Sequence, residues 1–188
     1  MDHVDDYLMT QNLIPTQLCR SLIRESSLRK WSKHTWYDNT RGTRSSMAEK
    51  ELDVIDSTPI QFKSLFKYLS IALQNYQKKY SILRGKENAS WISRISHVRF
   101  NRYKVGTKMR AHRDHIHSLF DGKLKGIPIL SFVGLLNDKY EGGEFMCREK
   151  EIKLRRGDIL LFPSNFMYPH EVKEITKGIR VNGTLYLL

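Results

Sequence analysis

Three residues in the second half of the chain have the types and the spacing to bind a metal ion. His112 and Asp114 stand two positions apart, and His170 lies 56 residues after Asp114. On a β-strand, residues two apart point to the same face, so His112 and Asp114 can present an imidazole and a carboxylate to one ion. Two histidines and one carboxylate on one side of the ion suit Fe(II) and leave three coordination positions open. We therefore predict a metal centre of His112, Asp114 and His170.

The same segment contains two further histidines, so the spacing alone leaves the choice of ligands open. His115 and His117 also stand two positions apart, and a single His-X-Asp pattern is common by chance. Asp114 is the only acid in reach of His112 before Asp121. We therefore expect His115 and His117 to face solvent or to lie behind the ligands.

An arginine follows the distal histidine at a spacing that suits the binding of a small diacid. Arg180 lies ten residues after His170, within Gly178-Ile179-Arg180-Val181. A guanidinium is a planar fork that binds a carboxylate through two hydrogen bonds. A diacid that binds the metal through one end needs such a group for its other end. Alone, Arg180 would be interpreted as a surface ion-pair residue, but after the three predicted ligands it favours a carboxylate clamp.

The chain is strongly basic, and one stretch concentrates this charge. It has 32 Lys and Arg against 20 Asp and Glu, a formal net charge of +12, which favours acidic partners, nucleic acid among them. The stretch from 94 to 113 is either a solvated basic face or an electropositive rim for an acidic peptide or a nucleic acid strand. Arg102 and Arg110 are our candidates there for substrate contact. Its basic residues are Arg94, Arg99, Arg102, Lys104, Lys108, Arg110 and Arg113, and it has no acid.

Two aromatic residues are further candidates for substrate contact. Trp36 and Tyr37 begin the polar segment 36–57, which we interpret as a candidate lid over a binding site. Their rings are either a surface on which a substrate stacks or anchors in the core. The core role is the commoner one for aromatic residues of this kind.

Strand signals fill the half of the chain that must position these groups. The expected strands cover residues 95–105, 127–136, 144–147, 159–162 and 179–188. Several follow glycine turns, and residues 127–136 are almost wholly apolar, as in a strand covered on both faces. Seven or eight short strands at this spacing predict a sandwich or jelly roll.

Residues 1–90 indicate helical support, with an extended connector or loop over 31–57. Pro15 lies near the start of a first amphipathic helix. Thr58-Pro59-Ile60-Gln61 combines a capping box with Pro at the first helical position. Apolar residues at helical spacing then predict a long amphipathic helix that ends at residues 85–88 and packs on the back of the sheet. We expect one domain over residues 1–188, with the β core in 91–188.

Composition excludes several classes of protein. Apolar residues make up 40% of the chain, enough for a core, so a wholly disordered chain is excluded. No apolar run reaches the roughly 18 residues of a membrane-spanning helix, and the acidic N-terminus does not resemble a signal peptide. Cys19 and Cys147 form no spacing motif, so we expect neither a disulfide framework nor a cysteine zinc site. These features predict a cytoplasmic protein.

Residues 95–188, about half of the chain, resemble the catalytic core of the 2-oxoglutarate- and Fe(II)-dependent oxygenases, and within them the prolyl 4-hydroxylase-like branch. The resemblance rests on five pieces in the family's order and spacing. They are the Tyr-x-x-Gly approach strand in 102–106, the His-x-Asp in 109–114, the strand and Gly-Gly-Glu turn in 135–145, the Gly-Asp strand in 156–163, and the distal His with the co-substrate Arg in 170–180. Each piece is weak or moderate alone, and together they are specific.

The resemblance implies a double-stranded β-helix with the helices outside it. It implies Fe(II), 2-oxoglutarate and O2 as cofactor and co-substrates, and adds ascorbate to the expected cofactors. Ser131 is our candidate for the second partner of the 2-oxoglutarate carboxylate, and Tyr186 stands where the family often has Trp. The implied residues are His112, Asp114 and His170 for Fe(II), and Arg180, Tyr103, Ser131 and Thr184 for 2-oxoglutarate.

The resemblance also implies the reaction, namely hydroxylation of an aliphatic C–H bond. The order of the motifs favours a prolyl residue of a peptide or protein as substrate. The net charge keeps open an oxygenase that acts on nucleic acid or on a small molecule. A catalytically silent jelly-roll binding module is the remaining alternative, and the complete set of predicted ligands argues against it. The oligomeric state is left open by the sequence.

Overall fold

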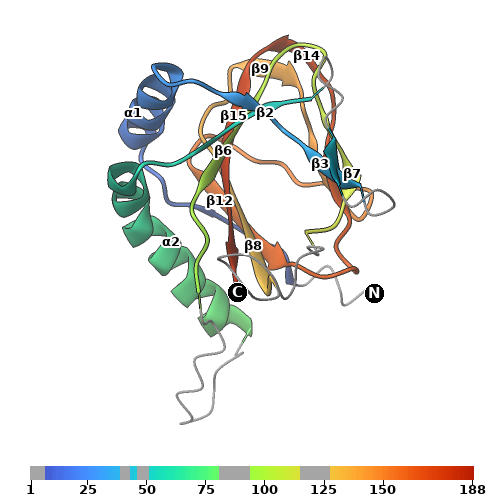
Figure 1. Cartoon of the computed structure of the whole chain (residues 1–188). Helices are drawn as coiled ribbons and strands as arrows, with labels where there is room; N and C mark the ends of the chain where they lie inside the picture. Colours follow the sequence, from blue (N-terminus) through green and yellow to red (C-terminus); the bar gives the residue numbers. More distant parts are fainter. Residues whose placement is uncertain (1–6, 39–42, 46–50, 81–93, 115–127) are drawn as a thin grey trace.

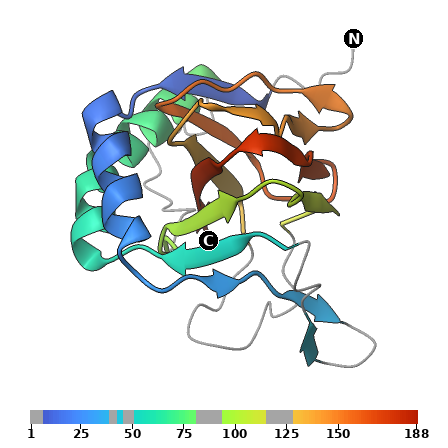
Figure 2. The same ribbon diagram turned by 90° about the horizontal axis from the view of Figure 1, so that it is seen from above.

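Two antiparallel β-sheets lie face to face, and both helices cover the outer face of the larger one (Figures 1 and 2). The computed structural model describes residues 7–38, 43–45, 51–80, 94–114 and 128–188. In the order in which they pair, the larger sheet contains β1 (Met9–Asn12), β12 (Asp158–Pro163), β8 (Leu130–Leu135), β15 (Arg180–Leu187), β6 (Arg99–Tyr103), β5 (Asp53–Asp56) and β2 (Ser32–Lys33).

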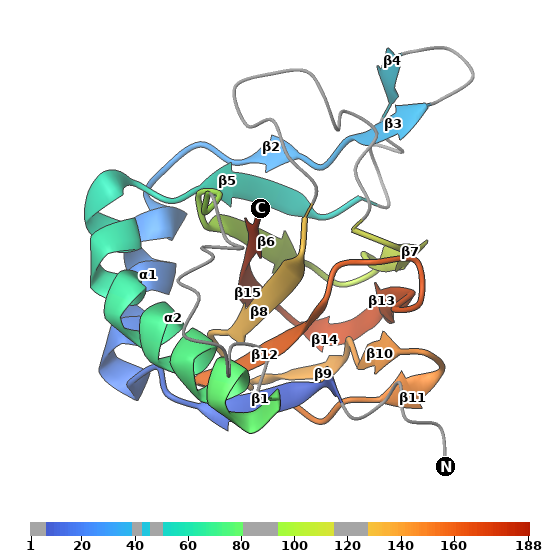
Figure 3. The same cartoon turned by 90° about the horizontal axis from the view of Figure 1, so that it is seen from below.

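The smaller sheet carries two of the predicted metal ligands. In the order in which they pair, its strands are β11 (Lys150–Glu151), β10 (Phe145–Cys147), β13 (His170–Val172) and β7 (Met109–His112). Two short ribbons complete the fold, β9 (Tyr140–Gly142) with β14 (Ile175–Gly178), and β3 (Trp36–Asp38) with β4 (Thr43–Ser45). From β6 onward the chain passes back and forth between the two large sheets, as Figure 3 shows. The predicted double-stranded β-helix is therefore confirmed.

The apolar run at 127–136 has the predicted two-sided burial. Alternate residues of β8 belong to two different cores: Phe132 packs under the helices, and Val133 packs between the sheets. Its partner β12 divides in the same way, with Leu161 under the helices and Phe162 between the sheets. A strand with apolar neighbours on both faces needs apolar residues at every position, and this explains why the run does not alternate.

The long helix begins where its capping signals predict. In α2 (Pro59–Tyr80), the Thr58 hydroxyl accepts the Gln61 backbone N–H at 3.2 Å, and the Gln61 side chain accepts the Thr58 backbone N–H at 3.0 Å. This reciprocal pair satisfies two N–H groups that the first helical turn leaves free. Leu65, Ala72 and Tyr76 then pack on the sheet. The predicted end at 85–88 lies outside the described residues.

The first half is less helical than expected. Besides α1 (Thr16–Ser27) and α2, it contributes β1 to one side of the large sheet and β5 and β2 to the other. The expected connector 31–57 contains β2, β3, β4 and β5. The edges of a sheet offer unpaired N–H and C=O groups, which short polar segments can pair through their backbone alone. Side-chain pattern therefore gave no signal for these strands.

The two cysteines and the two helices bear on the expectations about disulfides and membrane segments. Cys19 and Cys147 are both buried, and neither forms a disulfide within the described part of the chain. Among the described helices, none combines the length and the apolar composition that crossing a membrane requires.

Candidate functional site

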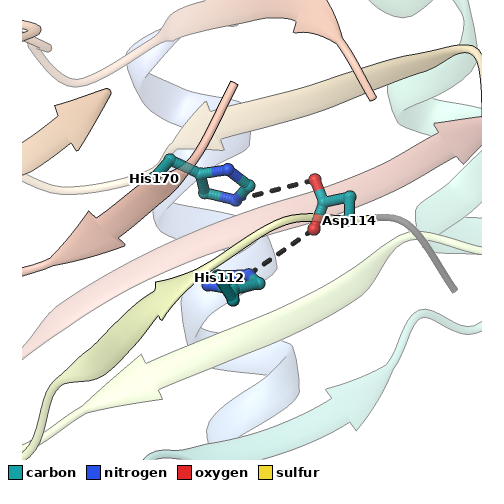
Figure 4. A group of neighbouring side chains, drawn as sticks. All are labelled: His112, Asp114 and His170. Carbon is teal, nitrogen blue, oxygen red and sulfur yellow. Dashed lines mark ion pairs between the residues drawn. The ribbon is translucent and has the colours of Figure 1, made fainter. Parts of the chain in front are cut away.

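The fold brings the three predicted metal ligands together (Figure 4). His112 ends β7 and pairs directly with His170, the first residue of β13. Asp114 follows β7 by two residues and extends its carboxylate between the two rings. Its Oδ1 lies 3.5 Å from His112 Nε2, and its Oδ2 lies 3.6 Å from His170 Nε2. One ligand atom from each residue lies within 4.8 Å of the others, so the three can share one ion.

Both histidines are oriented through the nitrogen that faces away from Asp114. His112 Nδ1 lies 2.8 Å from the Arg110 carbonyl oxygen, and His170 Nδ1 lies 3.1 Å from the Tyr168 carbonyl oxygen. A carbonyl only accepts, so each Nδ1 carries the proton and each Nε2 keeps its lone pair for a metal. Phe145 also stacks on the His170 ring, with centroids 5.6 Å apart.

Both oxygens of Asp114 are held by hydroxyl donors. Ser131 donates to Oδ2 at 2.5 Å, and Tyr186 donates to Oδ1 at 3.2 Å. The Ser131 hydroxyl also shares a hydrogen bond of 2.6 Å with Ser164. The observed partners of Ser131 thus favour a role in holding Asp114 over the predicted role as a partner of 2-oxoglutarate. Burial and the neighbouring Asp114 raise the pKa of Tyr186, so its hydroxyl stays a donor.

The protonation states of this group fit a divalent metal. Burial alone would raise the pKa of Asp114, but His170, His112 and the Ser131 hydrogen bond hold it below its usual value. Burial lowers the pKa of His170 although the Asp114 carboxylate opposes it. An ionised carboxylate beside a neutral imidazole is the state that binds a metal without first losing a proton. The donor set therefore fits Fe(II).

Arg180 is the most deeply buried cation of the site. It is 1% exposed, its Nη1 donates to Asn182 Oδ1 at 2.5 Å, and its guanidinium lies 5.2 Å from the centre of the Tyr103 ring. Among the described residues its Nε has no hydrogen-bond partner. Arg180 does not line the metal pocket itself but a neighbouring cavity of about 370 Å³. A buried guanidinium with an unpaired N–H fits a carboxylate as its missing partner.

The residues around Arg180 connect it with the metal pocket. Tyr103, Asn182 and Thr184 all line the pocket that contains His112, Asp114 and His170. Arg180 pairs with Tyr103 across β15 and β6, and its guanidinium lies against the Tyr103 ring. Of the predicted co-substrate residues, Tyr103 therefore touches both the metal pocket and Arg180, and Thr184 lines the metal pocket.

Trp36 forms part of the wall beside the metal ligands. Its ring meets the His112 ring edge to face, with centroids 5.5 Å apart, and the Arg110 guanidinium lies 4.5 Å from its centre. The indole N–H donates to the buried Glu51 carboxylate at 2.6 Å. The ring is therefore anchored by Glu51, as the core role predicts, and it also lies against the His112 ring. The side chain of Tyr37, and His115 and His117, lie outside what the structure describes.

Arg102 lies away from the pocket. It donates to Asp53 Oδ2 from Nη2 at 2.8 Å and from Nε at 3.1 Å, and it stacks on Trp31. Lys104 also pairs with Asp53 at 2.9 Å. Because these two cations are used by Asp53, the predicted basic rim is reduced, and Arg102 is disfavoured as a substrate contact.

The Asp53 cluster predicts a stability effect that depends on pH. Burial would raise the pKa of Asp53, but Lys104, Arg102 and Lys33 together lower it to about 2. A carboxyl whose pKa is lowered by folding stabilises the fold above its unfolded value of 3.8 and loses this contribution as pH falls toward 2. We expect Asp53→Asn to lower the free energy of unfolding at pH 7 by up to about 2 kcal/mol, less in high salt. In urea titrations the deficit should shrink between pH 4 and pH 2. Asp56→Asn, at an exposed position of the same strand, is the control and should leave the free energy of unfolding at pH 7 nearly unchanged.

Several residues of the site were not predicted from the sequence. Ser164, the residue after β12, acts through Ser131 of β8, and the two meet only because β12 and β8 pair in the sheet. Asn182 was detectable, because Arg180, Asn182 and Thr184 alternate on one strand and must share a face.

Comparison with known proteins agrees with this geometry. Residues 98–188 match the 2OG-Fe(II) oxygenase superfamily. A PKHD-type hydroxylase of Idiomarina loihiensis is 32% identical over 105 residues, which are 54% of this chain and 43% of that protein. A PKHD-type hydroxylase of Prochlorococcus marinus is 29% identical over 190 residues, which are 96% of this chain and 75% of that protein. The chain thus spans less than half of the first relative and three quarters of the second.

A solved structure shows the same fold. The prolyl hydroxylase of Trichoplax adhaerens, in complex with a hypoxia inducible factor oxygen degradation domain peptide fragment, superposes with a TM-score of 0.70 at 17% identity, covering 100% of this chain and 86% of that one. Family match, relatives and fold agree with the donor set at the metal pocket. By sequence, residues 98–188 thus belong to the 2OG-Fe(II) oxygenase superfamily, and the fold of the chain is that of solved prolyl hydroxylases.

Proposed function

We propose that this chain hydroxylates an aliphatic C–H bond of a peptide or protein, with a prolyl residue as the leading target. His112, Asp114 and His170 would hold Fe(II) in this reaction. The observation that carries the proposal is the convergence of their ligand atoms within 4.8 Å on one side of the pocket. Such a set binds the metal from one side and leaves the other open for co-substrate and O2.

The residues around the ligands prepare the site for this chemistry. When bound, Fe(II) and 2-oxoglutarate supply with O2 the oxidising power, which yields succinate and CO2 and puts one oxygen atom into the C–H bond. Ser131 and Tyr186 keep the Asp114 carboxylate oriented, and the carbonyls of Arg110 and Tyr168 keep the two imidazoles in the ligating tautomer.

Arg180 is the proposed partner of the far carboxylate of 2-oxoglutarate. Its buried Nε, which has no partner among the described residues, supports this role, since an ionised carboxylate would supply the missing acceptor. Asn182 fixes the guanidinium from one side and the Tyr103 ring covers it from another. We assign Tyr103 and Thr184 to the walls along which the co-substrate lies.

Two observations support a peptide as the substrate class: the side chains of Trp36 and Arg110 beside His112, and the likeness to prolyl hydroxylases. Trp36 offers a fixed aromatic surface next to His112, and Arg110 over its ring supplies an exposed cation. The Trichoplax enzyme, which shares the fold, was solved with a peptide. We assign Trp36 and Arg110 to substrate contact.

Ser131→Ala should weaken metal binding by about 10- to 100-fold, because Asp114 loses the donor at 2.5 Å that orients it. A titration with Mn(II), followed by electron paramagnetic resonance, measures this affinity. Tyr186→Phe should have a smaller effect, since its bond to Asp114 is 3.2 Å long. Ser21→Ala on the surface of α1 is the control. Unchanged Mn(II) affinity in Ser131→Ala would mean that Asp114 is oriented without the Ser131 hydroxyl.

The experiment that tests the function is a substrate screen with two readouts. The protein, Fe(II) and 2-oxoglutarate are incubated in air with proline-containing peptides, with single-stranded oligonucleotides and with free amino acids. Succinate release and the mass gain of one oxygen atom are measured for each. We expect peptides to stimulate succinate release and to carry the new hydroxyl on proline. Stimulation by oligonucleotides or amino acids only would contradict the proposed substrate class.

A further inference from the structure

The metal pocket contains a second arginine besides the one behind Tyr103. Arg99, the first residue of β6, lines the pocket together with the three metal ligands. It shares a face of β6 with Asn101 and Tyr103, which also line the pocket. The side chain is half-buried, so the guanidinium lies in the pocket wall.

Among the described residues, only one edge of the Arg99 guanidinium has a partner. Its Nε donates to Asn101 Oδ1 at 3.1 Å, and Asn101 is itself fixed through Nδ2, 3.4 Å from the Thr184 hydroxyl. In the described part of the chain the structure gives Arg99 Nη1 and Nη2 no hydrogen-bond or ion-pair partner. Arg102, on the other face of the same strand, has a carboxylate on its fork and an aromatic ring against it. Arg99 is therefore held in position with two N–H-bearing nitrogens left for a ligand.

The two pocket arginines serve opposite ends of the site. Arg99 faces Thr184 across the strand pair, and Arg180 faces Tyr103, four positions along the same ladder. Four residues of strand correspond to about 13 Å. The Arg99 end is also the metal end, since Tyr186, two residues after Thr184, reaches Asp114.

The guanidinium of Arg99 lies in the same pocket as the candidate metal ligands. A guanidinium near a divalent ion repels it, and this repulsion is relieved when an anion lies between the two. 2-Oxoglutarate has two carboxylates on a chain of four C–C bonds, which spans at most about 6 Å. One molecule therefore bridges the two ends, which lie about 13 Å apart along the strands, only where the long side chains of Arg99 and Arg180 cover the remaining distance.

We propose that Arg99 binds the carboxylate next to the keto group of 2-oxoglutarate, at the metal end of the pocket, while Arg180 binds the far carboxylate. This inference rests on the proposed function and adds a second positioning arginine for the co-substrate. It predicts that Arg99 couples the two ligands: it opposes binding of the metal alone and favours binding of the keto acid to the metal-loaded protein.

The test compares a keto monoacid with the diacid on the Mn(II)-loaded protein. 2-Oxobutyrate has the keto-acid end and lacks the far carboxylate, and calorimetric titration gives the affinity for each acid. In Arg99→Met, we expect the affinity for 2-oxobutyrate and for 2-oxoglutarate to fall about tenfold, while the affinity for Mn(II) alone does not fall. In Arg180→Met, only 2-oxoglutarate should weaken. Arg24→Met, on the exposed face of α1, is the control and should change none of these.

Three outcomes would overturn the inference. If Arg99→Met binds 2-oxobutyrate as the wild type does, Arg99 does not hold the keto-acid end, and the proposed function still stands. If Arg99→Met loses Mn(II) and both acids together, its role is only structural. If the wild-type protein binds Mn(II) and neither acid, the proposed function itself fails, and the role of Arg99 with it.

Discussion

His112→Ala and Asp114→Asn should each lower the affinity for Fe(II) by more than about 100-fold and reduce succinate formation to background. The three side chains supply every protein ligand that the described site offers, and two ligands cannot hold Fe(II) against water at the concentrations used in an assay. Asp114→Asn preserves the shape that Ser131 and Tyr186 surround. Fe(II) titration under anaerobic conditions and succinate release in air are the two measurements.

A matched control separates loss of the ligand from loss of the fold. Glu171 follows His170 on β13 and pairs with the exposed Lys173, so Glu171→Ala should retain both Fe(II) binding and turnover. The melting temperature of His112→Ala without metal should stay near that of the wild type, because the side chain is only partly buried. Full activity in either ligand variant would show that the metal centre lies elsewhere.

The β core could be predicted because its residues carry local signals. Because β8 is buried on both faces, its sequence is a continuous apolar run. The start of α2 is set by a hydrogen-bonded pair of residues only three positions apart. The metal ligands could be predicted because His112 and Asp114 lie on one strand end and His170 follows in the family's order. These features depend on neighbours in the chain or on a motif.

The remaining features depend on the sheet register, which a single sequence does not contain. Ser164 meets Ser131, and Thr184 meets Arg99, across strand pairs that the local pattern does not identify. One of these features could have been deduced from the sequence. The resemblance assigns Tyr103 to the co-substrate pocket, so alternation places Arg99 and Asn101 on the same face of the strand and Arg102 on the other. Alternation alone thus excluded Arg102 and selected Arg99.

Arg180→Met should raise the 2-oxoglutarate concentration required for half-maximal turnover by about 100-fold, while Fe(II) binding remains intact. The far carboxylate would lose its charge-assisted hydrogen bonds in a buried place, where such bonds are strongest. Arg180 contacts none of the three metal ligands in the interactions that the structure describes, so the metal affinity should not change. Lys177→Met, at an exposed position of β14 that pairs with Glu141, removes the same charge nearby and should leave the requirement unchanged.

The melting temperature of Arg180→Met gives an independent test. We expect the substitution to weaken 2-oxoglutarate binding without lowering the stability of the ligand-free protein. Without co-substrate, the guanidinium of Arg180 is 1% exposed, with Nη1 bonded to Asn182 and Nε unpaired. A buried cation without a counter-charge is unfavourable, so Arg180→Met should melt at the same or a higher temperature than the wild type when both are free of ligand. Added 2-oxoglutarate with Mn(II) should raise the melting temperature of the wild type far more than that of the variant. A ligand-free variant that melts well below the wild type would mean that Arg180 is a structural residue, whose charge is already balanced within the fold.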